Sequence, residues 1–538
     1  MGVAAPFPSG MCDDPELALG VALDEWDMNL PADLHRASLR ELSAALDRRE
    51  VCAREIVAYY LARTAVLDPL LHAFVDVDAE RACALADAAD TLRRNGVVLS
   101  PLHGLPIVLK DLLELEGGRT SLGSRHYIDR RSRHTSAAVE RLLSAGMIPL
   151  GKVHMTEFAF GGWGTNSLMG TPRNPWDGEA YRVPGGSSSG TGVAVAADLA
   201  PAGIGSDTGG SVRIPSAFNG ITGLKVTWGR ISLHATGLLS WTLDTLGPMA
   251  HEVQDCAWLL DVLAGPDPRD PATLRQPVES FAQVRSSVHR MRVGIVDEDQ
   301  LPDFMEEGVV ANWRAAVRAL EAQGARTTVL KLPAWFFSLA SATGRLIAAE
   351  AYHQHAALVR DASLPLDEAV RSRILAAERV TSSDYAGELR LMMERRAAML
   401  DELREVDVLS LPTVAAVAPA LPIDEDSPLP AYLTRPVNYL GLCALAQPSG
   451  LAYPGGLTGP DSFPRRLPTS VQWIAKPFEE ATLLAVGAAY ERACGHHRMR
   501  CPVEQWGMQG PTPAPSSTGG SVPSRDAAPP ADALPPGA

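Results

Sequence analysis

Residues 203–227 read GIGSDTGGSVRIPSAFNGITGLKVT, and a second stretch, residues 183–200, reads VPGGSSSGTGVAVAADLA. Both contain a Gly-Gly-Ser element, and the run of small apolar residues in the second stretch predicts a tightly packed, buried helix. Fifteen of the 46 glycines of the chain fall within residues 161–223. Glycine lets the backbone approach a ligand closely and lets successive amides point to one spot. We therefore expect the chemistry of this protein to lie in these two stretches.

Three kinds of structure use glycine in this way. A phosphate-binding loop is disfavoured, because neither stretch contains GxxxxGK[ST] or a GxGxxG that opens a helix after a strand. Tight turns explain single glycines but not two Gly-Gly-Ser elements so close together. An oxyanion hole beside a serine nucleophile fits both stretches, because loop amides can stabilise the negative oxygen formed when a hydroxyl attacks a carbonyl.

A serine nucleophile needs a base, and a histidine is the first type to consider. His154 and His234 lie near the two stretches in sequence, but neither has a clear carboxylate partner to complete a Ser-His-Asp triad. No GxSxG motif surrounds Ser211, the serine of the second Gly-Gly-Ser element, which argues against an α/β-hydrolase nucleophile there. A histidine base is therefore the weaker of the two hypotheses.

Lys110 is the stronger candidate for the base. It ends the apolar run LPIVL (105–109), and loss of hydration in such a run lowers the pKa of an amine. Lys and Arg together number 48, yet only five are Lys, and three of these lie between residues 110 and 225. Arginine stays charged, so a task that needs a neutral amine needs a lysine. An ion pair of Lys110 with Asp111 or Glu114 is the structural alternative, which the residues alone leave open.

The motifs together resemble those of the amidase signature enzymes. The resemblance runs from about residue 38 to residue 500, and its core consists of GLPIVLKDLLE, GKVHMTEFAFG, GTPRNPWD, PGGSSSGTGVAVA, GSDTGGSVRIPSAFNGITGLKVTWGRIS and LDTLGPMA. It implies an α/β fold with a single large amidase-signature domain, in which helices cover both faces of a central, twisted, mixed β-sheet. The strand–helix–strand pattern over residues 291–333 also favours an α/β sheet.

The resemblance implies a Ser–cis-Ser–Lys triad. Ser211 matches the nucleophile, Ser187 the bridging serine that follows a cis peptide, and Lys110 the base. No metal and no organic cofactor are implied. The oxyanion hole matches four consecutive backbone amides, those of Thr208, Gly209, Gly210 and Ser211.

The activity implied is hydrolysis of a carboxylic amide C–N bond through an acyl-enzyme on Ser211, with carbamate (urethane) or ester bonds as related substrates. Three residues match the family segment that lines the acyl side of the site: Ala159, Phe160 and Gly161. Trp163 and Trp241 would add apolar walls, so we expect an apolar or aromatic group on the substrate.

A second function from the same family stays open. The chain could be the glutaminase (A) subunit of a tRNA-dependent amidotransferase, which passes ammonia to a partner. Ile214 follows the sequence SVR, where amidotransferase subunits usually carry Gln, and this difference favours a free-standing hydrolase.

Composition limits the class of protein and its partners. The 538 residues are 46% hydrophobic and 21% charged, which excludes wholesale disorder. The net charge of −15 argues against nucleic acid or an anionic membrane as a partner. We therefore expect a small-molecule amide or carbamate substrate as the main partner, and a homodimer as the oligomer to test.

Sequence features also predict the location and the boundaries of the domain. The chain contains no CxxC pair, no signal-peptide pattern and no run of 18 apolar residues, so we expect a cytoplasmic protein without a zinc site or a transmembrane helix. Residues 1–37 form an acidic N-terminal arm in this prediction. Residues 38–505 form the amidase signature domain, and residues 506–538, rich in Pro, Ala, Ser and Gly, form a disordered tail.

Overall fold

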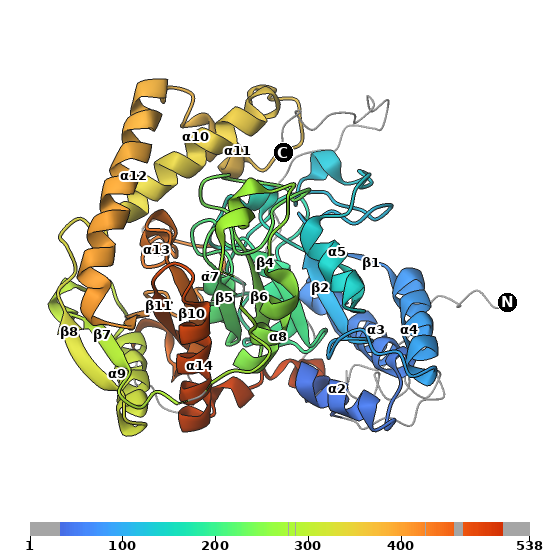
Figure 1. Ribbon diagram of the computed structural model, residues 1–538. Coiled ribbons are helices and arrows are strands. Elements are labelled where there is room, and N and C mark those ends of the chain that lie inside the picture. The colour runs from blue at the N-terminus through green and yellow to red at the C-terminus, as the bar shows by residue number, and fades with distance from the viewer. Residues whose placement is uncertain (1–32, 278, 286, 425–426, 457–465, 509–538) are drawn as a thin grey trace.

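The fold is organised around one mixed sheet of 11 strands, in the order β1-β3-β2-β4-β6-β5-β10-β11-β9-β7-β8 (Figure 1). A computed structural model describes residues 33–277, 279–285, 287–424, 427–456 and 466–508. Residues 1–32 of the predicted arm and 509–538 of the predicted tail lie outside the described residues, whereas the short helices η1 (Leu34–Arg36) and η9 (Val503–Met508) reach into both segments and bury Leu34 and Trp506. The strands are β1 (Phe74–Val77), β2 (Pro106–Lys110), β3 (Ile148–Val153), β4 (Ala202–Ser206), β5 (Thr222–Lys225), β6 (Leu246–Ala250), β7 (Arg292–Val296), β8 (Arg326–Leu330), β9 (Val408–Pro412), β10 (Cys443–Ala452) and β11 (Leu467–Ala475).

The sheet is mixed because its two ends contain parallel pairs and its middle is antiparallel. Strand β2 runs parallel to both β3 and β4, and β7 runs parallel to both β8 and β9. The pairs β4–β6, β6–β5, β5–β10, β10–β11 and β11–β9 are antiparallel. The predicted α/β class, mixed sheet and single large domain are confirmed.

Helices cover both faces of the sheet, as predicted (Figure 1). Helices α6 and α7 pack against each other and on the central strands, whereas α8, α9 and α14 form a second group. The helices are α2 (Leu39–Asp47), α3 (Ala53–Leu71), α4 (Ala79–Arg94), α5 (Ala137–Ser144), α6 (Ser189–Ala196), α7 (Arg213–Asn219), α8 (Val253–Leu263), α9 (Glu307–Ala322), α10 (Leu339–Arg360), α11 (Glu368–Leu375), α12 (Ser382–Glu402), α13 (Arg435–Tyr439) and α14 (Glu480–Cys494).

Two helices show how sequence pattern decides position. Helix α6 reads SGTGVAVA and every residue in it is buried, because small side chains let it pack closely between α7 and strands β2, β3, β4 and β6. Helix α9 is amphipathic, and it buries one face that includes Val309, Trp313 and Leu320. The predicted buried helix is confirmed.

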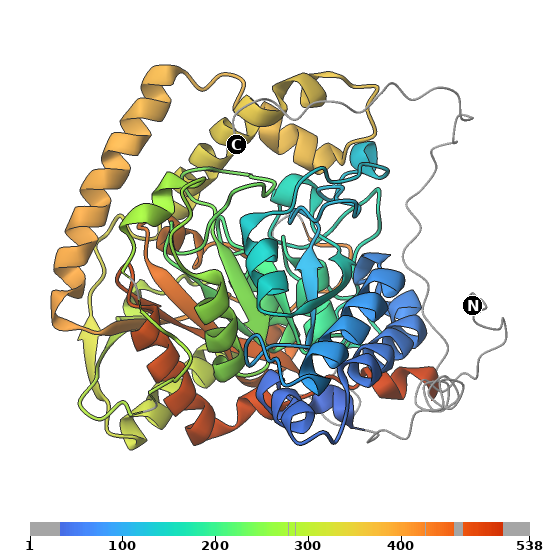
Figure 2. The same cartoon turned by 45° about the vertical axis from the view of Figure 1, so that its right-hand side comes forward.

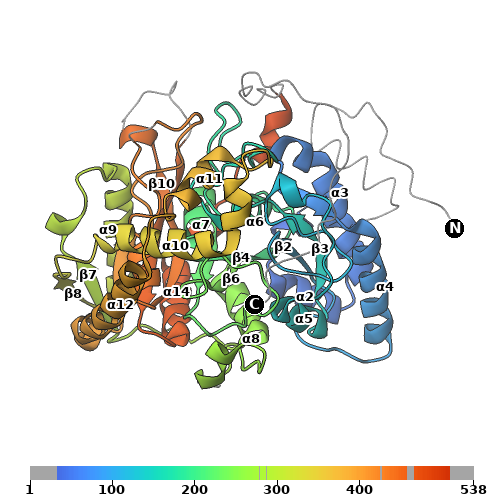
Figure 3. The ribbon, with the colours of Figure 1, turned by 90° about the horizontal axis from the view of Figure 1, so that it is seen from above.

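The remaining helices lie around the ends and the top of the sheet. Figure 2 shows α2, α3 and α4, in blue, at the end where β1 lies, and α12, in orange, at the opposite end. Seen from above in Figure 3, α10 and α11 cross over the region of α7. Along the described ranges, no helix is long and apolar enough to cross a membrane.

Candidate active site

Three separate segments bring the predicted triad residues into one region. Lys110 is the last residue of β2, Ser187 lies just before α6, and Ser211 lies between β4 and α7. The Gly186–Ser187 peptide is cis, as the resemblance implies. The Ser188 amide donates to the carbonyl oxygen of Ser211 at 3.3 Å, so the two serine-containing loops touch.

Lys110 is surrounded by hydroxyl groups rather than by acids. Its Nζ lies 2.7 Å from Ser187 Oγ, 2.9 Å from Ser188 Oγ and 2.8 Å from Ser206 Oγ. Burial lowers the pKa of Lys110 to about 7, although the charges of Asp244 and Asp207 act in the opposite direction. A neutral amine has two N–H donors and one lone pair, and three hydroxyls can satisfy all of them. The geometry therefore suits a lysine that exchanges a proton with a serine.

The alternative ion pairs of Lys110 do not form. The Asp111 carboxylate accepts hydrogen bonds from the Ser121 amide and from the Gly123 amide. Glu114 pairs instead with Arg130. His154, the alternative base, lies beside the first turn of α6, where the Gly190 amide donates to its carbonyl oxygen.

The Ser211 hydroxyl makes no hydrogen bond to the rest of the triad in this structure. Ser211 is 8% exposed, and within the described chain no hydrogen bond joins its hydroxyl to Ser187. A serine nucleophile commonly forms its catalytic hydrogen bond only when substrate is bound. Lys110 and Ser187 are thus in contact, and Ser211 lies one step further along the implied proton path.

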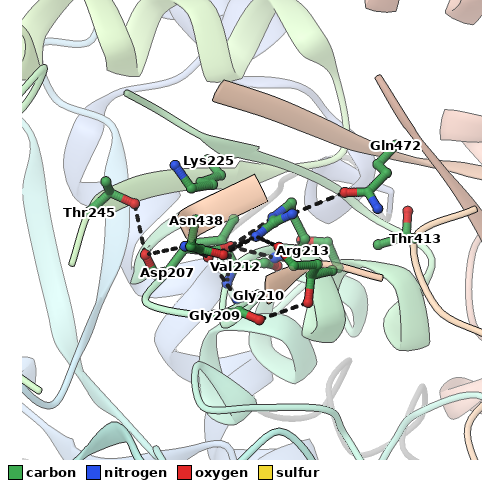
Figure 4. Close-up of polar contacts among 12 residues, drawn as sticks. Asp207, Gly209, Gly210, Val212, Arg213, Lys225, Thr245, Thr413, Asn438 and Gln472 are labelled. Atoms are coloured by element: carbon green, nitrogen blue, oxygen red, sulfur yellow. Dashed lines mark hydrogen bonds and ion pairs between the residues drawn. The ribbon is translucent and has the colours of Figure 1, made fainter. Parts of the chain in front are cut away.

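The loop that carries Ser211 is organised by Asp207. The Asp207 carboxylate accepts hydrogen bonds from the amides of Gly210 at 2.8 Å and Val212 at 3.2 Å (Figure 4). The Gly210 amide is therefore engaged. The other three predicted oxyanion-hole amides, of Thr208, Gly209 and Ser211, have no partner in the part of the chain that the structure describes. They remain free to donate to a substrate oxygen.

The fully buried Arg213 forms an ion pair with the Asp207 carboxylate. Arg213 Nε lies 3.0 Å from Asp207 Oδ2, and the same guanidinium donates to Gln472 Oε1 at 3.0 Å and to Asn438 Oδ1 at 2.6 Å (Figure 4). Burial opposes the charge on Asp207, but Arg213 and Asn438 hold its pKa below the usual range. The nucleophile loop is thereby fixed to β11 and α13, which are distant in sequence.

A second acid supports the start of the same loop. Thr208 Oγ1 donates to Asp244 Oδ1 at 2.5 Å, and Asp244 also accepts from the amides of Leu239 and Ser240. Burial raises the pKa of Asp244 to about 6. Asp244 therefore holds Thr208 in the position from which its amide can face the substrate.

The predicted substrate-binding segment lies next to the turn before α6. Ala159 is the last residue of the short helix η3 (Glu157–Ala159), and Phe160 and Gly161 follow it. The Gly186 amide donates to the carbonyl oxygen of Gly162 at 2.8 Å, which ties this segment to the turn that carries Ser187. Gly161 and Gly162 thus lie against the turn that carries Ser187, and Ala159 and Phe160 directly precede them in the chain.

Two arginines near the predicted substrate-binding segment were not identified as candidate site residues from the sequence. Arg373 of α11 donates to the carbonyl oxygen of Phe160, and a Cβ added at Gly161 would lie 3.1 Å from its Nη1. Arg435 packs on the nucleophile loop, since a Cβ added at Gly209 would lie 3.1 Å from its Cγ. Arginine is so common in this chain that neither residue stands out before the fold is known.

The charge of these two arginines is poorly compensated. Among the described residues, neither forms an ion pair, and Arg435 donates only to the carbonyl oxygen of Ala340 at 3.2 Å. Burial and the charge of Arg373 together lower the pKa of Arg435 to about 10. Asp367 exerts an opposite charge on Arg373, but its carboxylate also caps the start of α11. The site therefore contains a concentration of positive charge beside the oxyanion-hole loop.

A family model described as Amidase matches residues 55–484. The chain belongs to the amidase signature family. The predicted family is thus confirmed, and the protein is an enzyme acting on C–N bonds. The A subunit of the glutamyl-tRNA(Gln) amidotransferase of Chloroflexus aggregans (strain MD-66 / DSM 9485) is 36% identical over 497 residues, which cover 87% of this chain and 98% of that protein.

Solved structures of relatives show the same fold. A structure titled "An unexpected vestigial protein complex reveals the evolutionary origins of an s-triazine catabolic enzyme" has a TM-score of 0.78 and 30% identity over 85% of this chain and 99% of that chain. The native peptide amidase of Stenotrophomonas maltophilia has a TM-score of 0.72 and 28% identity, over 85% of this chain and 96% of its own.

These relatives correct the predicted partners. The prediction combined a small-molecule substrate with a possible homodimer and excluded nucleic acid. The exclusion of nucleic acid and the homodimer are wrong, because the curated relative is by name one subunit of an enzyme of glutamyl-tRNA(Gln). The error came from the net charge of −15, which argues only against extensive phosphate contacts by this chain itself. One subunit can work in an assembly on tRNA while other subunits make those contacts.

Proposed function

We propose that this chain is the glutaminase subunit of a glutamyl-tRNA(Gln) amidotransferase. In this proposal it cleaves the side-chain amide of glutamine and releases ammonia for a partner subunit. The observation that carries the proposal is the positive charge of Arg373 and Arg435 beside the oxyanion-hole loop. Glutamine has a carboxylate at the end remote from its amide, and a guanidinium fork binds a carboxylate through two parallel hydrogen bonds. The curated relative supports the same function.

The chemistry needs only groups that the site contains. Neutral Lys110 accepts the proton of Ser187, and Ser187 takes the proton of Ser211 as Ser211 Oγ attacks the amide carbon. The carbonyl oxygen becomes an oxyanion that the free amides of the 208–211 loop stabilise, each donor contributing about 2.7–4 kcal/mol.

Collapse of this intermediate breaks the C–N bond and leaves a γ-glutamyl ester on Ser211. The proton taken from Ser211 returns through Ser187 to the leaving nitrogen, which departs as ammonia. A water molecule then attacks the ester while Ser187 and Lys110 accept its proton, and the same two residues return a proton to Ser211 Oγ as glutamate leaves. All atoms and protons balance without a metal or a redox partner.

A free-standing amidase is the second candidate. The structural similarity to the peptide amidase of Stenotrophomonas maltophilia favours it, because that protein acts on an amide without being named as part of a larger enzyme. The same two arginines would then bind an anionic group of another amide. Carbamate and ester bonds belong to this second candidate, since the same acyl-enzyme chemistry can cleave them.

Glutamine hydrolysis separates the two candidates. Ammonia release is measured with the purified chain alone and with the remaining amidotransferase subunits of the same genome, supplied with glutamyl-tRNA(Gln). The proposal predicts glutamine hydrolysis that increases in the complex and amidation of the tRNA-bound glutamate. Absence of glutamine hydrolysis in both preparations, together with turnover of a peptide amide, an anilide or an aryl carbamate, would establish the second candidate instead.

A further inference from the structure

A pocket of about 340 Å³ lies at the β1 end of the sheet, outside the site described above. Residues from β1, from η2 (Arg125–Tyr127) and its flank, from the end of β3 and from the 168–169 loop surround it. Its volume falls within the range of small-molecule sites in proteins. Most of its lining residues are apolar: Phe74, Val75, Ile128, Leu168 and Met169.

A buried imidazole forms one polar side of the pocket. His154 is only 6% exposed, and in the described ranges no side chain or backbone group makes a hydrogen bond to its ring. Burial lowers the pKa of His154 to about 4, so the ring is neutral at physiological pH. Buried polar groups in proteins are nearly always hydrogen-bonded, because an unsatisfied group loses its hydration without compensation. A hydrogen-bonding group of a bound ligand would supply the partner that the imidazole lacks.

The guanidinium of Arg125 forms the outer side of the pocket. Arg125 is exposed, and its one hydrogen bond is a long one of 3.4 Å from Nη1 to the carbonyl oxygen of Leu168. Among the described residues it has no carboxylate partner. Its guanidinium therefore keeps most of its donors for an anion at the pocket mouth.

We propose that this pocket binds a small aromatic carboxylate that carries a hydroxyl group on the opposite side of its ring. The carboxylate would bind the Arg125 fork, the ring would fill the space between the apolar walls, and the hydroxyl would bind the His154 ring. This combination uses every chemical feature of the lining. The proposal is independent of the function assigned to the Ser211 site.

The pocket and the triad are connected through the first turn of α6. The Gly190 amide, in the first turn of α6, donates to the carbonyl oxygen of His154 at 2.9 Å, and Ser187 lies three residues before Gly190. Arg373 and Arg435 do not line the pocket. Binding at the two places can therefore be distinguished by substitution.

Isothermal titration of the full chain with 4-hydroxybenzoate tests the proposal. We expect saturable binding with a Kd of about 1 mM or tighter. Benzoate, which lacks the hydroxyl, and 4-methylphenol, which lacks the carboxylate, should bind more weakly. Arg125→Gln should weaken binding about tenfold, because it removes a charged hydrogen-bond donor. Met169→Trp should abolish binding by filling the pocket from its wall; Ser121 Oγ loses its long contact with Met169 Sδ but keeps its hydrogen bond to Asp111.

Two control variants test whether the ligand binds in this pocket. Arg318→Gln, the same substitution on an exposed arginine of α9, should leave the Kd unchanged. Arg435→Gln should also leave it unchanged. Absence of saturable binding would overturn the proposal. Binding that Arg435→Gln weakens while Arg125→Gln and Met169→Trp do not would place the ligand in the Ser211 site, and would overturn it equally.

Discussion

Lys110 combines full burial with three hydroxyl partners and no acid within ion-pair distance among the described residues. A charged lysine in such a place would lose its hydration without gaining a counter-ion, so the environment favours the neutral amine. The other lysines of the signature region differ in their contacts. Lys225 donates to two carbonyl oxygens, those of Val226 and Leu442, and so joins β5 to the start of β10.

Replacement of Lys110 tests its role as the base. Lys110→Arg keeps the charge but cannot become a neutral base, and Lys110→Met keeps the length but has no amine. Both variants should lose activity by about 10³-fold, within the range for general acid–base catalysis. Steady-state amide hydrolysis measures the loss, and thermal unfolding shows which variant is folded. Substantial activity of a folded Lys110→Arg protein would rule out this lysine as the base.

The pH dependence should report the same residue. Lys110 is active when it is unprotonated, and its pKa of about 7 lies below the ordinary lysine value because of burial. The kcat/KM value should therefore rise about tenfold per pH unit up to pH 7 and level off above it. A profile measured on the free enzyme that stays flat between pH 5.5 and about pH 8.5 would contradict this assignment.

At the scale of elements, the nucleophile loop depends on segments far along the chain. Arg213 at the start of α7 joins Asp207 to Asn438 of α13 and to Gln472 of β11. Asn438 Nδ2 in turn donates to the Asp207 carboxylate at 2.8 Å. A buried network in which each member has a partner fixes one geometry, and a missing member leaves others unsatisfied.

Asn438→Ala should therefore affect turnover as well as stability. Loss of its hydrogen bonds should reduce the free energy of unfolding by about 1–3 kcal/mol. It should also lower kcat by tenfold to about a hundredfold with little change in KM, because the oxyanion-hole amides move relative to the substrate. Asn312→Ala is the control, since Asn312 makes comparable hydrogen bonds, to Leu451 and Thr469, away from the site. Equal effects of the two variants on kcat would argue against a positioning role.

The close packing of helix α6 requires a glycine at position 190, near the start of the helix. A Cβ added at Gly190 would collide with the backbone of Ala73 and of His154. Gly190→Ala should therefore destabilise the protein by about 1–3 kcal/mol, measured by denaturant unfolding. Gly387→Ala in α12 is the matched control, because nothing lies within 4 Å of the new Cβ. It should be neutral or stabilising by up to about 1 kcal/mol.

At the scale of the whole molecule, the candidate specificity site forms only when distant helices meet. Arg373 of α11 and Arg435 of α13 approach each other beside the 208–211 loop. Arg435→Gln should raise KM for glutamine about tenfold or more with a smaller effect on kcat, because it removes a charged hydrogen-bond donor to the carboxylate. Arg345→Gln in α10, whose guanidinium pairs with Glu388 at the surface, serves as control. An unchanged KM in Arg435→Gln would remove the main support for a glutamine substrate.

Some features of the whole molecule could be predicted from its sequence, and others depend on the fold. Glycine, serine and lysine stand out in the signature motifs, so the fold class, the family and the clustering of Lys110 with Ser187 were predictable. Arg373, Arg435, Asn438 and Gln472 belong to common residue types, and their importance depends on which partners the fold gives or denies them. The partners of the enzyme were misjudged for a related reason, since total charge describes a chain and not the assembly in which it works.

Formation of an acyl-enzyme on Ser211 is the central claim, and mass spectrometry tests it most directly. The protein is mixed with glutamine, quenched in acid during steady turnover and digested. We predict a γ-glutamyl adduct on the peptide that contains Ser211, its absence in Ser211→Ala, and its absence when glutamate replaces glutamine. An adduct on another residue, or hydrolysis of glutamine by a folded Ser211→Ala protein, would contradict the account.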